Sequence, residues 1–191
     1  MKKSIGIVGG MGPLATVDFE KKILDLSDAC LDQDYPKLIS INDGSIPDRT
    51  EALLHGGESP VPKIKQHIYT LKQQGVGVIC IPCNTSHAFI HEFEDALQDV
   101  RFVHMIDEVA REIKRFYPNV SSIGVLATDG TRQSKVYDKH LNEIGLSVVY
   151  PSNEDQQVIM QSIYGDNGIK AGKTKEPSNA LGKVVDHLKA Q

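Results

Sequence analysis

Short apolar runs alternate along the chain with longer segments whose apolar residues recur at the three- and four-residue spacing of a helix. The short runs are rich in Ile and Val, which is typical of strands. Because strands and helices alternate, the pattern predicts an α/β fold with parallel sheets covered by helices on both faces. Strands are predicted at 4–9, 37–43, 76–82, 102–106, 122–127 and 146–150, and helices at 13–30, 107–116, 131–144, 153–164 and 178–191.

Three sets of apolar residues mark helical faces most clearly. The first predicts a helix before the strand at 76–82, the second a continuous helix after it, and the third an apolar stripe on the last helix. The sets are Ile64, Ile68 and Leu71, then Phe89, Phe93 and Leu97, and finally Leu181, Val184, Val185 and Leu188.

The order of elements restarts part-way along the chain. The run SIGVLA at 122–127 echoes SIGIVG at 4–9, each followed by a predicted helix. We therefore expect two pseudo-symmetric, Rossmann-like units, a domain at 1–106 and a second at 107–191. The second unit has only two clear strands before its closing helical segments, so we expect it to be incomplete.

Composition limits the classes of partner. Charged residues make up 24% of the 191, hydrophobic residues 40%, and the net charge is −4, which is ordinary for a globular protein. No basic stripe suggests nucleic acid, and no apolar run approaches the ~20 residues of a membrane span. Lysines near the N-terminus precede no long apolar region, so we expect no secretion signal and a cytoplasmic location.

The chain has three cysteines, Cys30, Cys80 and Cys83. An odd, small number predicts thiols rather than disulfides in a reducing compartment. Cys80 and Cys83 form a C-x-x-C spacing, but Cys80 falls inside a predicted strand. No second C-x-x-C or histidine pair completes a zinc site. We therefore expect neither redox nor metal chemistry.

A glycine-rich stretch, GGMGPLAT at 9–16, follows the first strand. Glycines before a helix let backbone N–H groups approach an anion, and this favours a small-anion loop that includes Met11 and Gly12. A tight turn that needs positive φ explains the glycines about as well. The spacing at 10–15 also fits a dinucleotide fingerprint, but Asp43 is too distant to be its acidic residue.

The stretch PCNTSH at 82–87 follows the third strand. The carboxyl ends of strands are where open α/β sheets bind ligands, and a helix start favours the thiolate form of a cysteine. Asn84 and Thr85 could donate hydrogen bonds to a carboxylate there. His87 either tunes the thiol or caps the helix. An inert, buried Cys83 is the less favoured alternative.

Three other stretches offer polar groups beside predicted turns. Arg49 in IPDRT could bind a carboxylate through two hydrogen bonds, Thr128 in LATDGT begins a helix, and Lys170 lies in a basic loop. From the residues alone, a solvated arginine, a plain N-cap and a solvated lysine are the default interpretations.

These motifs, in this order, resemble the aspartate/glutamate racemase family, and most closely the aspartate racemases. The resemblance implies two α/β domains, a homodimer, no cofactor, and racemisation of a small acidic amino acid such as aspartate. It implies that Cys83 removes the α-proton. It further implies that the substrate is bound by Met11, Gly12, Arg49, Asn84, Thr85, Thr128 and Lys170, where Asn84, Thr85 and Thr128 hold the α-carboxylate, and Arg49 and Lys170 the distal one.

One departure from the family is clear. The family has a second cysteine in a Gly-Cys-Thr-Glu stretch after a later strand, and this chain has no cysteine beyond Cys83. We expect that part to be missing, through natural truncation, a frameshift or fragmentation, with full racemisation impaired. The alternatives are a catalytically inactive protein that binds a dicarboxylate or another anion, and a nucleotide-binding protein that uses residues 10–15.

Overall fold

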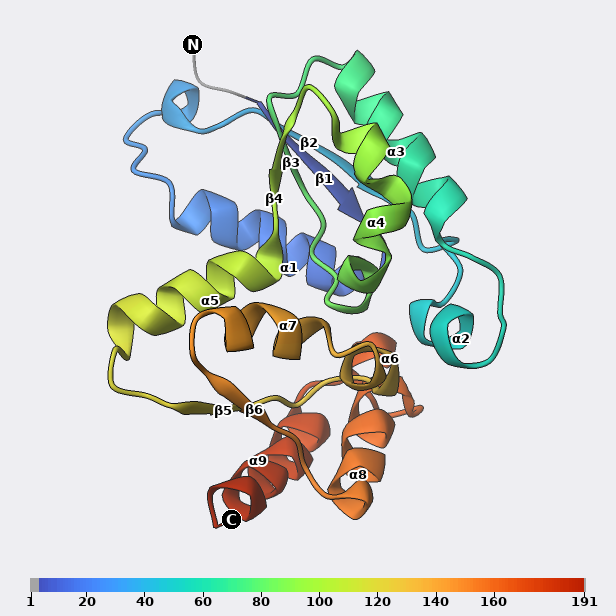
Figure 1. Ribbon diagram of the computed structural model, residues 1–191. Helices are drawn as coiled ribbons and strands as arrows, with labels where there is room; N and C mark the ends of the chain where they lie inside the picture. Colours follow the sequence, from blue (N-terminus) through green and yellow to red (C-terminus); the bar gives the residue numbers. More distant parts are fainter. Residues whose placement is uncertain (1–3, 191) are drawn as a thin grey trace. The chain divides into compact units, whose positions relative to one another are not determined.

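The computed structural model describes residues 4–190. The chain divides into two compact units, Met1–Met105 and Ile106–Gln191 (Figure 1). Both units combine parallel strands with helices, so the predicted α/β class is confirmed. Within the described residues, no helix is both long and apolar enough to cross a membrane.

The first unit contains a four-stranded sheet in the order β2-β1-β3-β4, and every neighbouring pair is parallel. The central strand β1 pairs on both sides, with Ile7 opposite Ser40 on one side and Cys80 on the other. Parallel pairing places all the carboxyl ends at one edge of the sheet. The strands are β1 (Ile5–Gly9), β2 (Leu38–Asn42), β3 (Val78–Cys80) and β4 (Arg101–Val103).

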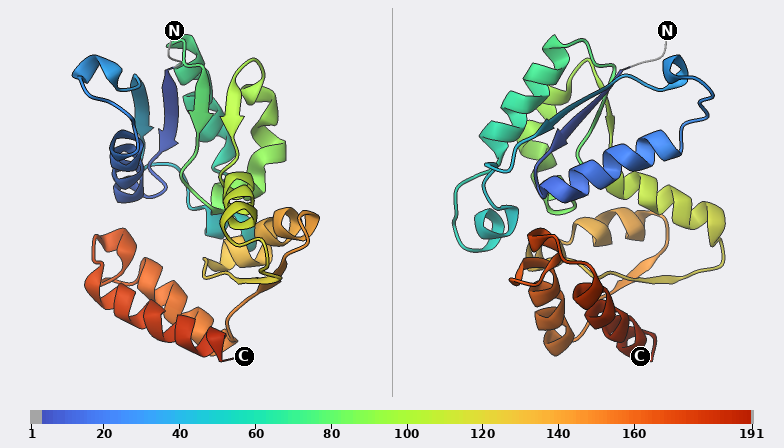
Figure 2. Two further views of the ribbon diagram at one scale, coloured as in Figure 1. Left: turned by 90° about the vertical axis from the view of Figure 1, so that its left-hand side faces the viewer. Right: turned by 180° about the vertical axis from the view of Figure 1, so that it is seen from behind.

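Helices cover both faces of this sheet, with α1 on one side and α3 on the other (Figures 1 and 2). The predicted apolar face of α3 is confirmed, because Ile64, Ile68 and Leu71 are completely buried. The helical elements are α1 (Pro13–Asp25), η1 (Asp32–Asp34), α2 (Arg49–Leu54), α3 (Val61–Gln73), η2 (Thr85–Phe89), α4 (Ile90–Phe93) and η3 (Glu94–Leu97), where η denotes a 3-10 helix.

The continuous helix predicted after residue 82 is wrong. Three short pieces, η2, α4 and η3, replace it. The residues at the two junctions, Phe89 (φ −98°, ψ 7°) and Phe93 (φ −128°, ψ 7°), leave helical geometry. Each break redirects the chain, and Phe89, Phe93 and Leu97 all still reach the core.

Two other predicted helices also differ. The helix expected over 13–30 ends at Asp25, because Ser27 donates its hydroxyl to the carbonyl of Ile23 and ends the last turn. The helix expected over 131–144 begins at Asp129 and is interrupted at Lys135, whose φ of 52° is left-handed. Most predicted strands are also longer than the observed ones, because pairing ends before the apolar run does.

The second unit contains a parallel two-stranded sheet, β5 (Ser122–Gly124) and β6 (Ser147–Val149). Helix α8 begins and ends where the sequence predicts, and Ser152 caps it by accepting a hydrogen bond from the backbone N–H of Asp155. Val184, on the predicted stripe of α9, is buried. The helical elements are α5 (Met105–Phe116, which crosses the boundary), α6 (Asp129–Gln133), α7 (Val136–Glu143), α8 (Asn153–Tyr164), η4 (Ile169–Ala171) and α9 (Lys175–Lys189).

Gly10 follows the last pair of β1 and β2, Gly9 with Asn42, and tests how closely the two backbones approach each other beyond it. Its φ is +97°, and a Cβ there would lie 2.1 Å from the Asp43 carbonyl oxygen. We expect Gly10→Ala to lower the free energy of unfolding by about 2 to 4 kcal/mol, through strain and a backbone clash. Urea denaturation followed by circular dichroism measures it.

Gly75→Ala is the matched control, since its φ is +73° but nothing lies within 4 Å of the added Cβ. Only the left-handed backbone then costs free energy, about 1 kcal/mol. Equal losses for the two variants would contradict the close approach of Gly10 to Asp43.

Candidate functional site

The carboxyl edge of the first sheet brings together three of the sequence motifs. Met11 and Gly12 follow β1, Arg49 lies at the start of α2 after β2, and Cys83 follows β3. Met11 and Cys83 belong to the same buried cluster, and α2 contacts η2. The sheet therefore places an arginine, a thiol and a glycine-rich turn at one edge.

Hydrogen bonds to its N–H and to its carbonyl fix the backbone of Cys83. Its side chain is buried, with the residue 7% exposed. Its N–H donates to the carbonyl of Ile81 at 2.8 Å, and its carbonyl accepts the hydroxyl of Ser86 at 2.8 Å. None of the three cysteines forms a disulfide, as the sequence predicts. Cys80 lies inside β3, as the sequence predicts.

His87 also binds the Cys83 carbonyl, through Nδ1 at 2.8 Å. Its Nε2 accepts a hydrogen bond from the backbone N–H of Met105, with the two nitrogens 3.3 Å apart. An accepting Nε2 carries no proton, so Nδ1 is the donor and the ring is neutral. The sequence allows His87 to tune the thiol or to cap the helix. In the structure its ring bonds to two backbone groups, the Cys83 carbonyl and the Met105 N–H.

The helix that follows Cys83 is the five-residue 3-10 helix η2 and not the expected α-helix. Asn84 is exposed and Thr85 is buried at its start. Both lie directly after the thiol at the carboxyl edge. A short 3-10 helix aligns few peptide dipoles. Nearby side chains therefore stabilise a negative charge at this edge more than the dipole of the helix does.

The glycine-rich turn is closed by Thr16. Its hydroxyl accepts from the N–H of Gly10 at 3.0 Å and donates to the carbonyl of Gly12 at 3.2 Å. Met11 points into the core and is 7% exposed, so it offers backbone groups alone to this edge. Gly12 is the N-cap of α1 and has no side-chain cap.

Arg49 is buried and is not the solvated arginine that the residues alone suggest. One guanidinium nitrogen donates to the carbonyls of Ile46 at 3.3 Å and Pro47 at 3.0 Å. Another lies 3.9 Å from a carboxylate oxygen of Asp48. Nε is buried without a hydrogen-bond partner. The charge is thus held in place by its own loop, with donor capacity left over.

Asp43 belongs to a network that the sequence did not reveal. Its carboxylate accepts from the N–H and hydroxyl of Ser45, at 2.8 and 2.5 Å, and lies 2.8 Å from Nε2 of His67. Lys63 donates to the Ser45 hydroxyl in turn. These groups, the Ser45 hydroxyl first, hold the pKa of Asp43 well below its usual range. The two-residue spacing to Ser45 is the one sequence signal for this turn.

The second unit carries the remaining motif residues. Thr128 is the N-cap of α6 and accepts from the N–H of Thr131 at 3.3 Å. Lys170 lies in η4, with its ammonium 4.1 Å from the centre of the Tyr164 ring, a cation–π contact. Gln156 donates from Nε2 to the carbonyl of Ala127 and to Asp129, and so fixes the turn around Thr128.

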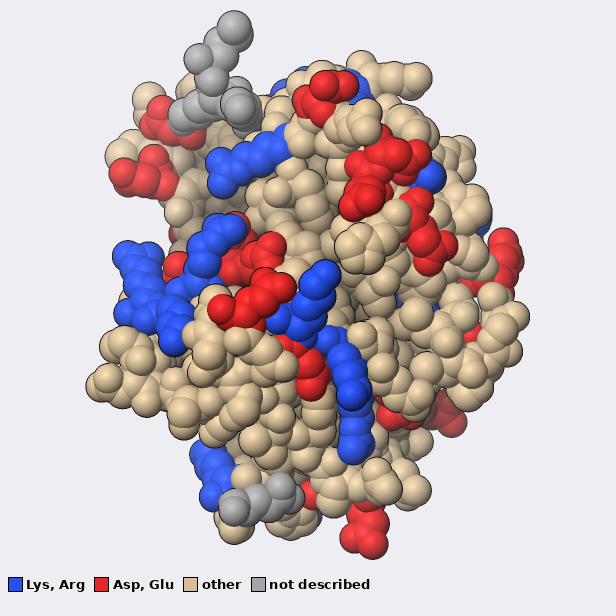
Figure 3. Space-filling view, viewed as in Figure 1, with Lys and Arg blue, Asp and Glu red and all other residues tan. Residues whose placement is uncertain are grey.

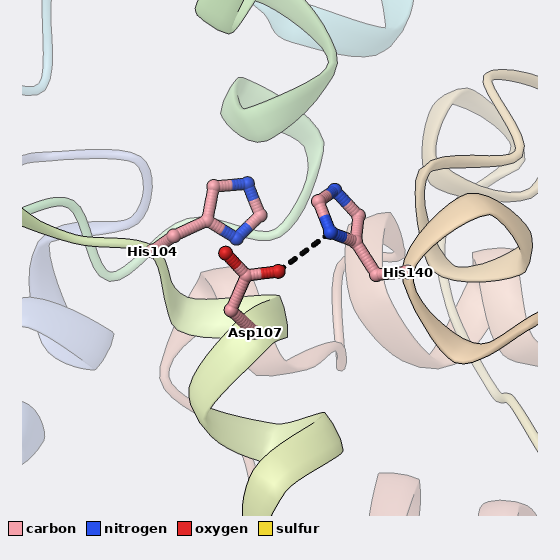
Figure 4. A group of neighbouring side chains, drawn as sticks. All are labelled: His104, Asp107 and His140. Atoms are coloured by element: carbon pink, nitrogen blue, oxygen red, sulfur yellow. Dashed lines mark ion pairs between the residues drawn. The ribbon is translucent and has the colours of Figure 1, made fainter. Parts of the chain in front are cut away.

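Two further features belong to this unit. A cavity of about 710 Å³ is lined by residues of α6 and α8, among them Asp129, Arg132 and Gln156. His140 on α7 pairs with Asp107 on α5 at 2.6 Å (Figure 4).

On the face of the chain seen in Figure 3, Lys and Arg side chains are interspersed with Asp and Glu.

Comparison with known proteins decides the family. The sequence profile of the Asp/Glu/hydantoin racemases matches residues 8–191. The chain belongs to this family. It is therefore a racemase, which is an isomerase, and the family resemblance noted from the motifs is confirmed.

Individual relatives agree with this assignment. The broad specificity amino-acid racemase RacX of Bacillus subtilis (strain 168) is 28% identical, over 98% of this chain and 89% of that protein. The Picrophilus torridus aspartate racemase is 34% identical with a TM-score of 0.87, over 99% of this chain and 77% of that one. An aspartate racemase homologue from Pyrococcus horikoshii OT3 is 25% identical with a TM-score of 0.73, and the match covers 98% of this chain and 80% of that one.

The low pKa of Asp43 predicts how the stability of this racemase changes in acid. A depressed pKa means that the carboxylate stabilises the folded state above the unfolded pKa, about 3.9, and that this contribution is lost as the pH falls through the folded pKa. We expect Asp43→Asn to cost about 1 to 2 kcal/mol at pH 6. The difference from the unmodified protein should shrink below about pH 4.

Urea denaturation at a series of pH values measures this difference. Glu58→Gln is the control, because Glu58 is an exposed acid in the loop before α3. A cost of Asp43→Asn that stayed constant down to pH 2 would show that charge is not the cause.

Proposed function

We propose that this racemase acts on aspartate or a related acidic amino acid, without a pyridoxal or other cofactor, and that the thiolate of Cys83 removes the α-proton. The observation that carries the proposal is the position of Cys83. It is a buried cysteine, outside any disulfide, and its backbone is fixed at the carboxyl edge of the parallel sheet. That edge is where open α/β sheets bind their ligands.

The proposed step transfers one proton. The Cys83 sulfur accepts the proton from Cα and becomes a thiol, and the electron pair of the C–H bond stays on the substrate. That charge spreads onto the α-carboxylate, so groups that donate hydrogen bonds to the carboxylate stabilise the carbanion. Return of a proton to the opposite face completes racemisation, and return to the same face only exchanges the hydrogen.

We propose two sets of substrate contacts. Asn84, Thr85 and Thr128 bind the α-carboxylate, and the turn at Met11 and Gly12 contributes backbone N–H groups. Arg49 and Lys170 bind the distal carboxylate. Support for Arg49 comes from its burial, the carbonyls that orient it and the donor capacity left on Nε. Support for the substrate class comes from the Picrophilus torridus relative, which is an aspartate racemase.

The family resemblance supports a proposal about the location and the oligomeric state of the enzyme. We propose a cytoplasmic homodimer in which each chain has two α/β domains, 1–106 and 107–191. Support for this division comes from the two compact units, whose boundary lies between Met105 and Ile106.

A member of this racemase family that still binds a dicarboxylate but has lost inversion is the second candidate. Cys83 is the last cysteine in the chain, and Cys30 is exposed while Cys80 lies within β3. A single thiol base explains proton removal from one face of Cα alone. Exchange and inversion therefore need separate measurements.

Cys83→Ser tests the proposed base. In heavy water, the unmodified protein should replace the α-hydrogen of aspartate with deuterium, whether or not the configuration inverts. Cys83→Ser should lose at least about 100-fold of the exchange rate, the scale of general-base catalysis. Proton NMR follows exchange, and chiral chromatography follows inversion.

Cys80→Ser is the matched control, since this thiol lies three residues earlier, at the last position of β3. Exchange that survived in Cys83→Ser would overturn the role of this thiolate. Binding of aspartate without exchange in the unmodified protein would instead establish the second candidate.

Arg49→Lys tests recognition of the distal carboxylate. Lysine keeps the charge but loses the planar, multidentate geometry. We expect the dissociation constant of L-aspartate to rise about 10- to 100-fold, the equivalent of one charged hydrogen bond, while that of L-alanine stays unchanged. Isothermal titration calorimetry measures both.

Arg101→Lys, at the exposed start of β4, serves as the control. Equal weakening for both amino acids would place Arg49 outside the distal carboxylate site. Thermal unfolding of each variant separates a binding effect from collapse of α2.

A further inference from the structure

Two side chains hold the peptide that follows the proposed base. The Cys83 carbonyl accepts the Ser86 hydroxyl and His87 Nδ1, both at 2.8 Å. The Cys83 N–H is bound to Ile81. With both backbone groups of one residue bound, the direction of its Cα–Cβ bond is fixed. Only rotation about χ1 then moves the sulfur.

The other nitrogen of His87 reaches a different element. Nε2 accepts from the N–H of Met105, the first residue of α5. The first N–H groups of a helix have no partner within the helix, and His87 supplies one from 18 residues away. The ring is 4% exposed and stacks edge-on against His104, with the ring centres 4.7 Å apart. Neither nitrogen is therefore turned outward to solvent.

We propose that His87 is a positioning residue, which fixes the direction of the Cys83 thiol by holding its carbonyl while anchored to the start of α5. This rests on the proposed function of Cys83. The imidazole spans the gap between the loop after β3 and the segment after β4, so the loop cannot shift unless one of two hydrogen bonds breaks. Misplacement of a reacting group by about 1 Å can cost about 100-fold in rate.

Two substitutions at His87 separate the effects of its two hydrogen bonds, one to the Cys83 carbonyl and one to the Met105 N–H. Asparagine places an N–H donor near the position of Nδ1, and so keeps the bond to Cys83 but loses the bond to Met105. Glutamine places an oxygen near the position of Nε2, and so keeps the bond to Met105 but loses the bond to Cys83. His91→Gln, on the exposed side of α4, is the matched control.

Two readouts are taken on the full chain, in a Cys30→Ser background because Cys30 is exposed. We expect His87→Gln to lower kcat for aspartate exchange about 10- to 100-fold with KM unchanged, and to speed alkylation of Cys83 by iodoacetamide as the loop loosens. His87→Asn, which keeps the bond to the Cys83 carbonyl but loses the anchor to α5, should change both values in the same direction and by clearly less than His87→Gln. Melting temperatures should fall for both variants, since each loses one buried hydrogen bond.

Equal effects of His87→Asn and His87→Gln on kcat and alkylation would overturn the proposal, as would no difference from His91→Gln. If His87→Gln does not fold, Ser86→Ala removes the other donor to the Cys83 carbonyl and should change both readouts in the same direction. If the unmodified protein shows no exchange, the proposed function fails, and the alkylation rates still decide whether His87 positions the thiol.

Discussion

The parallel pairing of β1 with β2 on one side and β3 on the other is the constraint on which the first unit depends. Ile7 lies opposite Ser40 and Cys80 at the same level of the sheet. Every strand therefore ends at one edge, and every chain reversal after a strand occurs there. A glycine-rich turn, a buried arginine and a cysteine, dozens of residues apart in sequence, become neighbours because of that pairing.

The loops at this edge share one solution to the same physical problem. Backbone that leaves a buried strand loses its ladder partners and must find others. In each loop, a side chain within a few residues supplies one. Thr16 closes the turn after β1, Asp43 accepts from Ser45 after β2, and Ser86 donates to Cys83 after β3. The edge is consequently ordered before any substrate arrives, which is what catalysis by positioned groups requires.

The second unit repeats this logic with fewer strands among its described residues. Thr128 caps α6, and Gln156 reaches back from α8 to the end of the β5 segment. Each unit thus holds its hydroxyl-bearing turn from two directions, once locally and once from a distant element. In the first unit the distant element is the start of α5, and the connecting side chain is His87.

The sequence by itself determined the α/β class, the order of strands and helices, the full extent of α8 and the motifs at the carboxyl edge, because these depend on local periodicity and on the chemistry of short segments. Tertiary structure alone decided that the helix after Cys83 breaks at Phe89 and Phe93. It also decided that Arg49 is buried, and that His87 bonds to Met105. These outcomes depend on which polar atoms and apolar side chains meet across the fold, and spacing along the chain carries no information about such non-local contacts.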